Sequence, residues 1–150
     1  MISSLLVVCH ANICRSPMAE VLLRKYLPQV TVASAGIQAL VGYPAASHAF
    51  EVAAAQGFDL ASHRARNLDA AQCTRADLIL VMEDVQRRYV ETRYPFTRGR
   101  VFCLGITNGR PADIPDPYGG QRSAFEQCMT RLEHSVTAWR ERINSLHADS

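Results

Sequence analysis

An α/β fold with a parallel, doubly wound sheet is what this sequence of 150 residues predicts. Short apolar runs alternate along the chain with segments whose apolar residues recur every three or four positions. The run at 78–82 is continuously apolar, as in strands that are covered on both faces. The length suits one hydrophobic core, so we expect a single domain over residues 1–150.

The first half of the chain begins with a strand, a loop and a helix. Residues 2–8 form an apolar run with β-branched side chains, which predicts a buried strand. A Ser-Pro pair then signals a helix start, and helical spacing of apolar residues predicts a helix over 16–27. A short strand is expected at 30–33. A helix is expected over 44–56, where a glycine follows as a C-terminal cap.

The second half repeats the alternation. After the strand at 78–82, acidic residues favour a helix that runs to about residue 94, and a fourth strand is expected at 101–104. Residues 105–120 are rich in Gly and Pro, and so long a loop is usually functional. A long amphipathic helix ends the chain, with a core-facing stripe of Phe125, Met129, Leu132, Val136, Trp139, Ile143 and Leu146.

Composition excludes several classes of function. The formal charge is +2 and no Lys/Arg-rich run occurs, which argues against nucleic-acid binding. No stretch approaches the roughly 20 apolar residues of a membrane helix, and no secretory signal is evident, so we expect a cytoplasmic protein. The five cysteines contain no Cys-x-x-Cys pair, which disfavours a disulfide framework and a zinc site. Three of them, Cys73, Cys103 and Cys128, receive no role.

The loop at 9–16, Cys-His-Ala-Asn-Ile-Cys-Arg-Ser, carries the candidate chemistry. It follows the first strand at the sheet edge where ligands bind, and it opens a helix whose free N–H groups and dipole attract an oxyanion. Arg15 can add two charge-assisted hydrogen bonds to phosphate. The same field stabilises a thiolate on Cys9, which suits covalent catalysis at phosphorus. A buried, inert cysteine at a strand end is the alternative interpretation.

A phosphatase also needs a group that protonates the leaving oxygen and then activates water. Asp116 is the candidate, because the long loop that contains it should return to the same edge of the sheet. Pro115 and Pro117 restrict its backbone. An Asp-Pro turn without chemistry is the alternative.

Residues 9–17 and the segment Asp-Pro-Tyr at 116–118 together resemble the motifs of the low-molecular-weight protein tyrosine phosphatases. The resemblance continues at Ser-Ala-Gly, 34–36, and at His-x-Ala-Arg, 63–66. It implies a four-stranded parallel sheet flanked by helices on both faces, with no metal or organic cofactor. It also implies hydrolysis of phosphotyrosine in proteins.

The resemblance assigns roles position by position. Cys9 matches the nucleophile that forms a phosphocysteine, Arg15 the residue that binds phosphate, and Asp116 the general acid and base. The phosphate-binding loop would comprise His10, Ala11, Asn12, Ile13, Cys14, Arg15 and Ser16. The network that supports the loop and the thiolate would comprise Asn12, Ser16, Ser34 and His63.

Three further expectations come from the same resemblance. Leu40 and Tyr118 match the wall against which the substrate ring packs. Cys14 matches a second thiol that pairs with Cys9 under oxidation and protects it from overoxidation. Ala11 departs from the family, which usually has Gly there, and would cost of order 1 kcal/mol if its φ were positive.

Within the family the sequence is most similar to bacterial members. These act on autophosphorylating tyrosine kinases that control capsule or exopolysaccharide export, so the implied partner is a tyrosine-phosphorylated protein such as the cytoplasmic tail of such a kinase. Two other functions compete. An arsenate reductase of the same fold would need two further cysteines close together, whereas Cys73 and Cys103 are far apart in the sequence. A non-catalytic phosphotyrosine-binding module would need neither a thiolate nor an acid.

Overall fold

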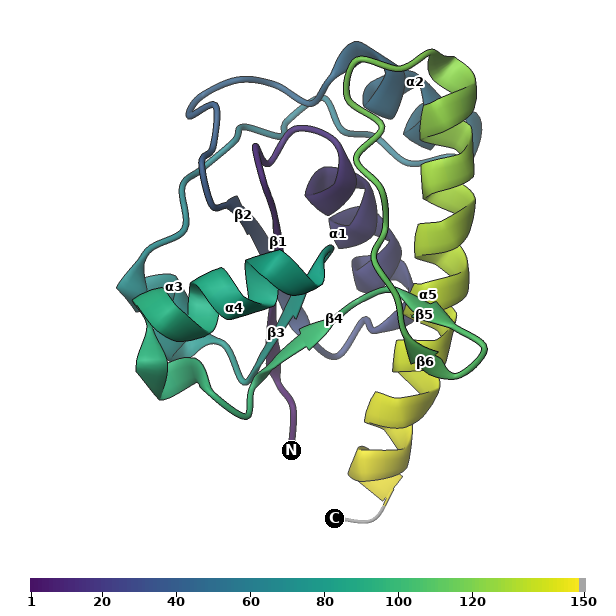
Figure 1. The fold of residues 1–150 in the computed structure, drawn as a ribbon. Helices are drawn as coiled ribbons and strands as arrows, with labels where there is room; N and C mark the ends of the chain where they lie inside the picture. Colours follow the sequence, from purple (N-terminus) through teal and green to yellow (C-terminus); the bar gives the residue numbers. More distant parts are fainter. Residues whose placement is uncertain (149–150) are drawn as a thin grey trace.

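Four parallel strands form the central sheet of the protein, in the order β2-β1-β3-β4. The structure is a computed structural model that describes residues 1–148 (Figure 1). β1 (Ser4–Cys9) lies between β2 (Thr31–Gly36) and β3 (Leu78–Val81), and β4 (Val101–Cys103) forms one edge. The predicted four-stranded parallel sheet is thus confirmed.

Helices cover both faces of this sheet (Figure 1). α1 (Arg15–Tyr26), α2 (Ser47–Ala55) and the long α5 (Arg122–Ala148) pack on one face. α3 (Ala70–Arg75) and α4 (Asp84–Arg93) pack on the other. Each face of the sheet carries its own hydrophobic core, and the side chains of β1 point alternately into the two. Leu5 and Val7 lie under α1 and α5, whereas Leu6 and Val8 lie under α3 and α4.

The sheet determines where the functional loop lies. β1 is a central strand and ends at Cys9, so the loop that follows emerges from the middle of the sheet's carboxyl edge. The N-terminus and the end of α5 lie together at the opposite end of the molecule, where His147 Nε2 is 3.0 Å from the carbonyl oxygen of Ile2 (Figure 1). None of the described helices combines the length and the apolar content that a bilayer crossing requires.

Some boundaries differ from the sequence prediction. β2 runs to Gly36 rather than to residue 33, because its last residues pair with the end of β1. α3 and the short 3₁₀ helix η1 (Pro95–Thr97) were not predicted, and the long loop contains a small antiparallel pair, β5 (Ile106–Thr107) and β6 (Arg110–Pro111). The stripe on α5 is buried as predicted except at its end, where Leu146 is exposed.

Candidate active site

The loop between β1 and α1 turns its carbonyl groups outward. Backbone N–H groups of the segment 37–46 donate hydrogen bonds at 2.9–3.2 Å to the carbonyl oxygens of Cys9, His10, Ala11 and Ile13. The remaining carbonyl, that of Asn12, lies 2.7 Å from His63 Nε2. The backbone N–H groups of Ala11, Ile13, Cys14 and Arg15 have no partner among the described residues. They are therefore available to an anion at the centre of the loop.

Asn12 gives the loop its shape. Its φ of 61° is the one left-handed conformation in the loop, and the backbone of Ala11 is not in that region. Alanine in place of the family's glycine therefore costs no left-handed strain. The Asn12 side chain is fully buried, donates from Nδ2 to Ser16 Oγ (2.7 Å) and Ser34 Oγ (3.0 Å), and accepts at Oδ1 from Arg66 N (2.9 Å).

Gly36 allows β2 to approach the loop closely. A Cβ at this position would lie 2.7 Å from the carbonyl oxygen of His10, which is shorter than a side-chain carbon tolerates. The end of β2 therefore presses directly on the backbone of the loop. The Ser-Ala-Gly segment is thus a structural neighbour of the candidate nucleophile.

The Cys9 sulfur lies at the base of the loop and is almost fully buried. Ser16 Oγ is 2.9 Å from it, and Asn12 N donates to it at 3.3 Å. Both groups lie within hydrogen-bond distance of the sulfur, so the Cys9 side chain is tied to the loop backbone and to the first turn of α1. The structure thus brings together Cys9, Asn12, Ser16, Ser34 and, through the Asn12 carbonyl, His63.

The hydrogen-bond chain continues to a residue that the sequence analysis missed. Ser34 Oγ donates to Glu20 Oε1 at 2.5 Å, and the other carboxylate oxygen forms an ion pair with Arg24 Nη2 at 2.5 Å. Glu20 is buried although it is charged, and its partner follows one turn later on α1. That i,i+4 spacing was visible in the sequence, but the contact with β2 was not.

Arg15 is buried and is held at one end of its guanidinium group. Nη1 forms an ion pair with Glu83 at 2.5 Å and donates to the carbonyl oxygen of Ile114 at 2.8 Å. Nη2 lies 3.5 Å from Asp116 Oδ2, and the buried Nε has no partner. Because an unpaired buried donor is costly, the Nε–Nη2 edge favours a ligand with two acceptor oxygens.

Glu83 was not singled out by the sequence analysis. It lies two residues after the end of β3 and so at the same carboxyl edge as Cys9, which is the signal that could have identified it. Its carboxylate holds a guanidinium that comes from 68 positions earlier in the chain.

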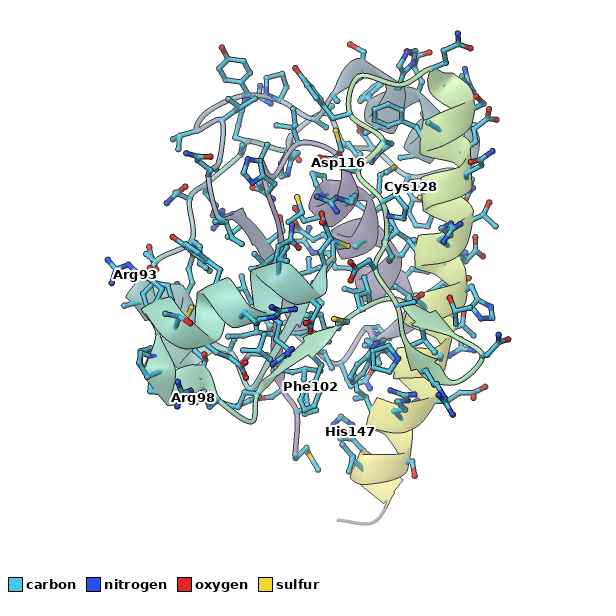
Figure 2. The ribbon with its side chains drawn as sticks, viewed as in Figure 1. Arg93, Arg98, Phe102, Asp116, Cys128 and His147 are labelled. Atoms are coloured by element: carbon cyan, nitrogen blue, oxygen red, sulfur yellow. The ribbon has the colours of Figure 1, made fainter. Side chains whose placement is uncertain are left out.

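Asp116 reaches the site from the long loop, as expected. Figure 2 shows it beside the loop that follows β1. Its carboxylate is partly exposed, with Oδ1 accepting from Tyr118 N at 3.1 Å and Oδ2 facing Arg15. The segment before it is fixed because Ile114 N donates to the carbonyl oxygen of Met82 at 2.9 Å.

A pocket of about 410 Å³ opens over the loop. Its floor contains Cys9 and Arg15, and its rim includes His10, Gln38 and Asp116. The remaining walls are mainly apolar or aromatic, and are formed by Ala11, Ile13, Cys14, Ala39, Leu40 and Tyr118. A polar, positively charged floor below apolar walls suits a phosphate group attached to a ring.

Cys14 occupies the N-cap position of α1 within the same loop, without a capping hydrogen bond from its side chain. Burial raises the pKa of its thiol to about 12, and the negative groups at Asp116, Cys9 and Cys128 add to the shift while Arg15 opposes it. Cys14 is therefore a protonated thiol at neutral pH. No cluster of three or more His, Cys, Asp or Glu side chains within residues 1–148 is arranged to hold a metal ion.

Residues 4–149 match the sequence profile of the low molecular weight phosphotyrosine protein phosphatases. The chain belongs to this family. It is 49% identical to the EpsP protein of Ralstonia nicotianae over 97% of this chain and 99% of that protein. It is 43% identical to the low molecular weight protein-tyrosine-phosphatase Wzb of Salmonella typhimurium over 97% of both chains. The protein is accordingly a protein-tyrosine phosphatase.

Solved structures agree with this assignment. The tyrosine phosphatase Wzb of Escherichia coli K30 in complex with sulphate superimposes with a TM-score of 0.90 and 37% identity, covering 95% of this chain and 99% of that one. The YwlE arginine phosphatase of Geobacillus stearothermophilus superimposes with a TM-score of 0.91 and 32% identity, covering 98% and 96%. The fold is therefore shared by enzymes that are named for two different phosphoamino acids.

Proposed function

We propose that this phosphatase hydrolyses phosphotyrosine in proteins through a phosphocysteine intermediate on Cys9, with Asp116 as general acid and then general base. The observation that carries the proposal is the unpaired edge of Arg15. Its Nε is buried without a partner, and it lies in a loop in which the backbone N–H groups of Ala11, Ile13, Cys14 and Arg15 are also unpaired among the described residues. The Cys9 sulfur belongs to the same loop, so a phosphate bound there faces a nucleophile.

In the first step the Cys9 thiolate attacks phosphorus and the bond from phosphorus to the tyrosyl oxygen breaks. The leaving oxygen takes a proton from Asp116, which stands at the pocket rim. Arg15 and the loop N–H groups stabilise the charge on the three equatorial oxygens. The products are a phosphocysteine and a dephosphorylated protein whose tyrosine carries a free hydroxyl group.

In the second step a water molecule attacks the phosphocysteine. Asp116, now ionised, accepts a proton from that water, and the bond from phosphorus to sulfur breaks. Cys9 leaves as a thiolate, which Ser16 Oγ at 2.9 Å and Asn12 N at 3.3 Å are placed to stabilise. Inorganic phosphate then leaves the loop.

The contact between Asp116 and Arg15 suggests how the acid is prepared. Without a ligand, Asp116 Oδ2 lies near the Arg15 edge that a phosphate would use. A bound phosphate ester carries more negative charge than one carboxylate and takes that edge, so Asp116 is turned toward the leaving oxygen. Repulsion between the ester and the carboxylate favours the protonated acid that the first step needs.

The walls of the pocket support an aromatic substrate. Leu40 and Tyr118 flank the opening and are both substantially exposed, so they are free to pack against a phenyl ring. A matching structure of Wzb from Vibrio vulnificus holds benzylphosphonate, which joins an aromatic ring to a phosphate-like group. The physiological partner we propose is the tyrosine-phosphorylated cytoplasmic tail of a bacterial autokinase that controls exopolysaccharide export. The similarity to EpsP and Wzb supports this choice.

Phosphoarginine is the competing substrate, because an arginine phosphatase shares the fold. A guanidinium group would favour an acidic wall, whereas Asp116 is the one carboxylate that lines the described pocket. The pocket therefore favours phosphotyrosine.

The decisive experiment measures hydrolysis in excess chelator. The substrates are para-nitrophenyl phosphate, a phosphotyrosine peptide and a phosphoarginine peptide. We expect turnover of the first two, a value of kcat/KM for phosphotyrosine at least tenfold above that for phosphoarginine, and no turnover by Cys9→Ser. Turnover that survives Cys9→Ser would contradict the covalent mechanism, and a preference for phosphoarginine would contradict the proposed substrate.

The same assay tests the acid. Asp116→Asn should slow substrates with poor phenolic leaving groups by a factor of 10² to 10⁴, and para-nitrophenyl phosphate much less, because the latter departs without a proton. Equal losses on both substrates would remove Asp116 from the acid role. Asp113→Asn, on the same segment but outside the pocket, is the matched control.

A further inference from the structure

Four arginines gather at the end of the molecule where α3, α4 and η1 meet. Arg75 ends α3, Arg93 ends α4, and Arg98 and Arg100 follow η1. Figure 2 shows Arg93 and Arg98 on the same side, away from Asp116. Arg75, Arg93 and Arg98 are exposed and Arg100 is half-buried. We call these four residues, with Tyr94 and Phe96, the basic-aromatic end.

The charge of this end is not neutralised by ion pairs. Among residues 1–148 no carboxylate lies within ion-pair distance of any of the four guanidinium groups. By contrast, Arg87 and Arg88 on the same helix both pair with Asp84. The carboxylates near the basic-aromatic end already serve the fold: Asp69 caps α3, and Asp77 accepts hydrogen bonds from Ser3 and Ser4.

Two arginines flank a pair of aromatic rings at this end. The Arg93 guanidinium lies 5.2 Å from the Tyr94 ring, the Tyr94 and Phe96 rings are 6.2 Å apart, and the Arg100 guanidinium lies 5.8 Å from the Phe96 ring. Arg100 also donates hydrogen bonds to the carbonyl oxygens of Cys73, Ala76 and Phe96, which join η1 to the end of α3. These hydrogen bonds fix the Arg100 side chain against η1 and α3.

Phe96 is presented outward despite its size. It is 51% exposed, and Pro95 before it starts the short 3₁₀ turn that carries it. An exposed aromatic ring among unpaired arginines fits the interfacial zone of a lipid bilayer, where the ring enters the headgroup region and the guanidinium groups meet anionic phosphates. An acidic protein segment could pair with the arginines, but it would not offer the Phe96 ring an apolar environment like that of the headgroup region.

We propose that the basic-aromatic end docks this phosphatase on membrane surfaces rich in anionic phospholipids. The active site stays free in this arrangement, because Glu83, which holds Arg15, lies just before the opposite end of α4. The ten residues of α4 separate the two ends by about 15 Å. A phosphatase docked in this way would work on phosphotyrosines held close to a membrane, and the proposal does not depend on which phosphotyrosine is the substrate.

The test is sedimentation of the full chain with vesicles in 50 mM salt. Vesicles contain either phosphatidylcholine alone or phosphatidylcholine with roughly one third phosphatidylglycerol. We expect binding to the anionic vesicles only, and at least a tenfold loss for Arg93→Glu/Arg98→Glu, because each basic residue near the surface contributes about fivefold to partitioning. Phe96→Ser should weaken binding severalfold without changing the net charge.

The matched control is Arg110→Glu/Arg131→Glu, which changes the net charge equally on the exposed surface of β6 and α5. It should bind vesicles within threefold of wild type. Rates with para-nitrophenyl phosphate and melting temperatures should stay unchanged in all variants, which shows that they fold. No binding by wild type, or equal losses in both double variants, would overturn the proposal. The proposal would also be overturned if a poly-glutamate peptide bound the protein more tightly than the anionic vesicles do and displaced the protein from them.

Discussion

At the residue scale, the two ends of the Arg15 guanidinium have different partners. Nη1 is engaged by Glu83 and by the Ile114 carbonyl, whereas Nε is unpaired and Nη2 faces Asp116 at 3.5 Å. Fixing one end orients the other toward the centre of the loop before a ligand arrives. We therefore propose that Glu83 positions Arg15 for phosphate binding.

Replacement of Glu83 by Gln should lower kcat/KM by about tenfold to a hundredfold, because a charged hydrogen bond of roughly 1.5–3 kcal/mol is lost. The inhibition constant of inorganic phosphate should rise in parallel, which a loss of general stability would not cause. Steady-state kinetics with phosphate as the inhibitor measures both. Glu91→Gln, which removes the surface partner of Arg87, is the control and should leave both values unchanged.

The raised pKa of Cys14 determines how fast this thiol would react with an oxidised Cys9. We expect peroxide to oxidise Cys9 to a sulfenic acid, from which the Cys14 thiolate would then displace hydroxide to form a Cys9–Cys14 disulfide. Because the pKa of Cys14 is about 12, its thiolate fraction is small at pH 7 and rises tenfold per pH unit. The resolving step should therefore accelerate about tenfold per unit between pH 7 and 9.

The disappearance of the sulfenic acid can be followed by trapping it with dimedone at timed intervals. A rate that does not depend on pH would show that Cys14 is not the resolving thiol. Cys14→Ser should leave the sulfenic acid long-lived and should allow more irreversible overoxidation than the wild type shows.

At the element scale, the end of β2 and the phosphate-binding loop form one packed unit. Gly36→Ala would place a Cβ 2.7 Å from the His10 carbonyl oxygen, so the loop must move. We expect a loss of about 1–3 kcal/mol in the free energy of unfolding and at least a tenfold loss of kcat/KM. Gly57→Ala is the control: Gly57 has a φ of +88° with open space around it, so its replacement should cost about 1 kcal/mol and leave kcat/KM unchanged. Denaturation and kinetics on the two variants distinguish the two effects.

The elements also show where prediction from sequence succeeds and where it fails. β3 and α5 were predictable because a continuous apolar run and a long helical stripe are local patterns. α3 has only six residues, too few to display a helical period, and its local signal was the reciprocal capping between Asp69 and Gln72. The candidate site residues within the segments 9–17 and 116–118 were predictable because each segment is a short motif of consecutive residues.

Glu83 and Glu20 were not predictable in that way. Their partners Arg15 and Ser34 lie 68 and 14 positions away, and they meet only because β1, β2 and β3 are adjacent in the sheet. Such contacts depend on strand order, which no short sequence pattern contains.

At the scale of the whole molecule, buried thiols link stability to pH. Burial raises the pKa of Cys128 to about 12 from its ordinary value of 9.0, so the folded protein keeps a proton that the unfolded chain releases above about pH 9. The free energy of unfolding is unaffected by this group below pH 9 and falls by up to about 1.4 kcal/mol per pH unit from there toward pH 12. Cys14 adds a loss with the same sign.

Cys128→Ala should therefore lower stability at pH 7, through the cavity it creates, but make the decline between pH 9 and 10.5 shallower by about 1 kcal/mol per unit. Urea denaturation at several pH values measures this slope. Met129→Ala, also fully buried on α5 but without a titrating group, should lower stability at every pH and keep the wild-type slope. Equal slopes in all three proteins would contradict the assignment.

The outward hydrogen bonds of the loop have a consequence for how such an enzyme diversifies. The carbonyl groups of Cys9, His10 and Ala11 bind main-chain N–H groups of the segment 37–46 and not its side chains. Substitutions at Gln38, Leu40 and their neighbours can thus alter the rim while the anion cradle keeps its geometry. Substrate preference and phosphate chemistry are separately adjustable in this fold, so selectivity can be redesigned by changing side chains of one segment without rebuilding the catalytic loop.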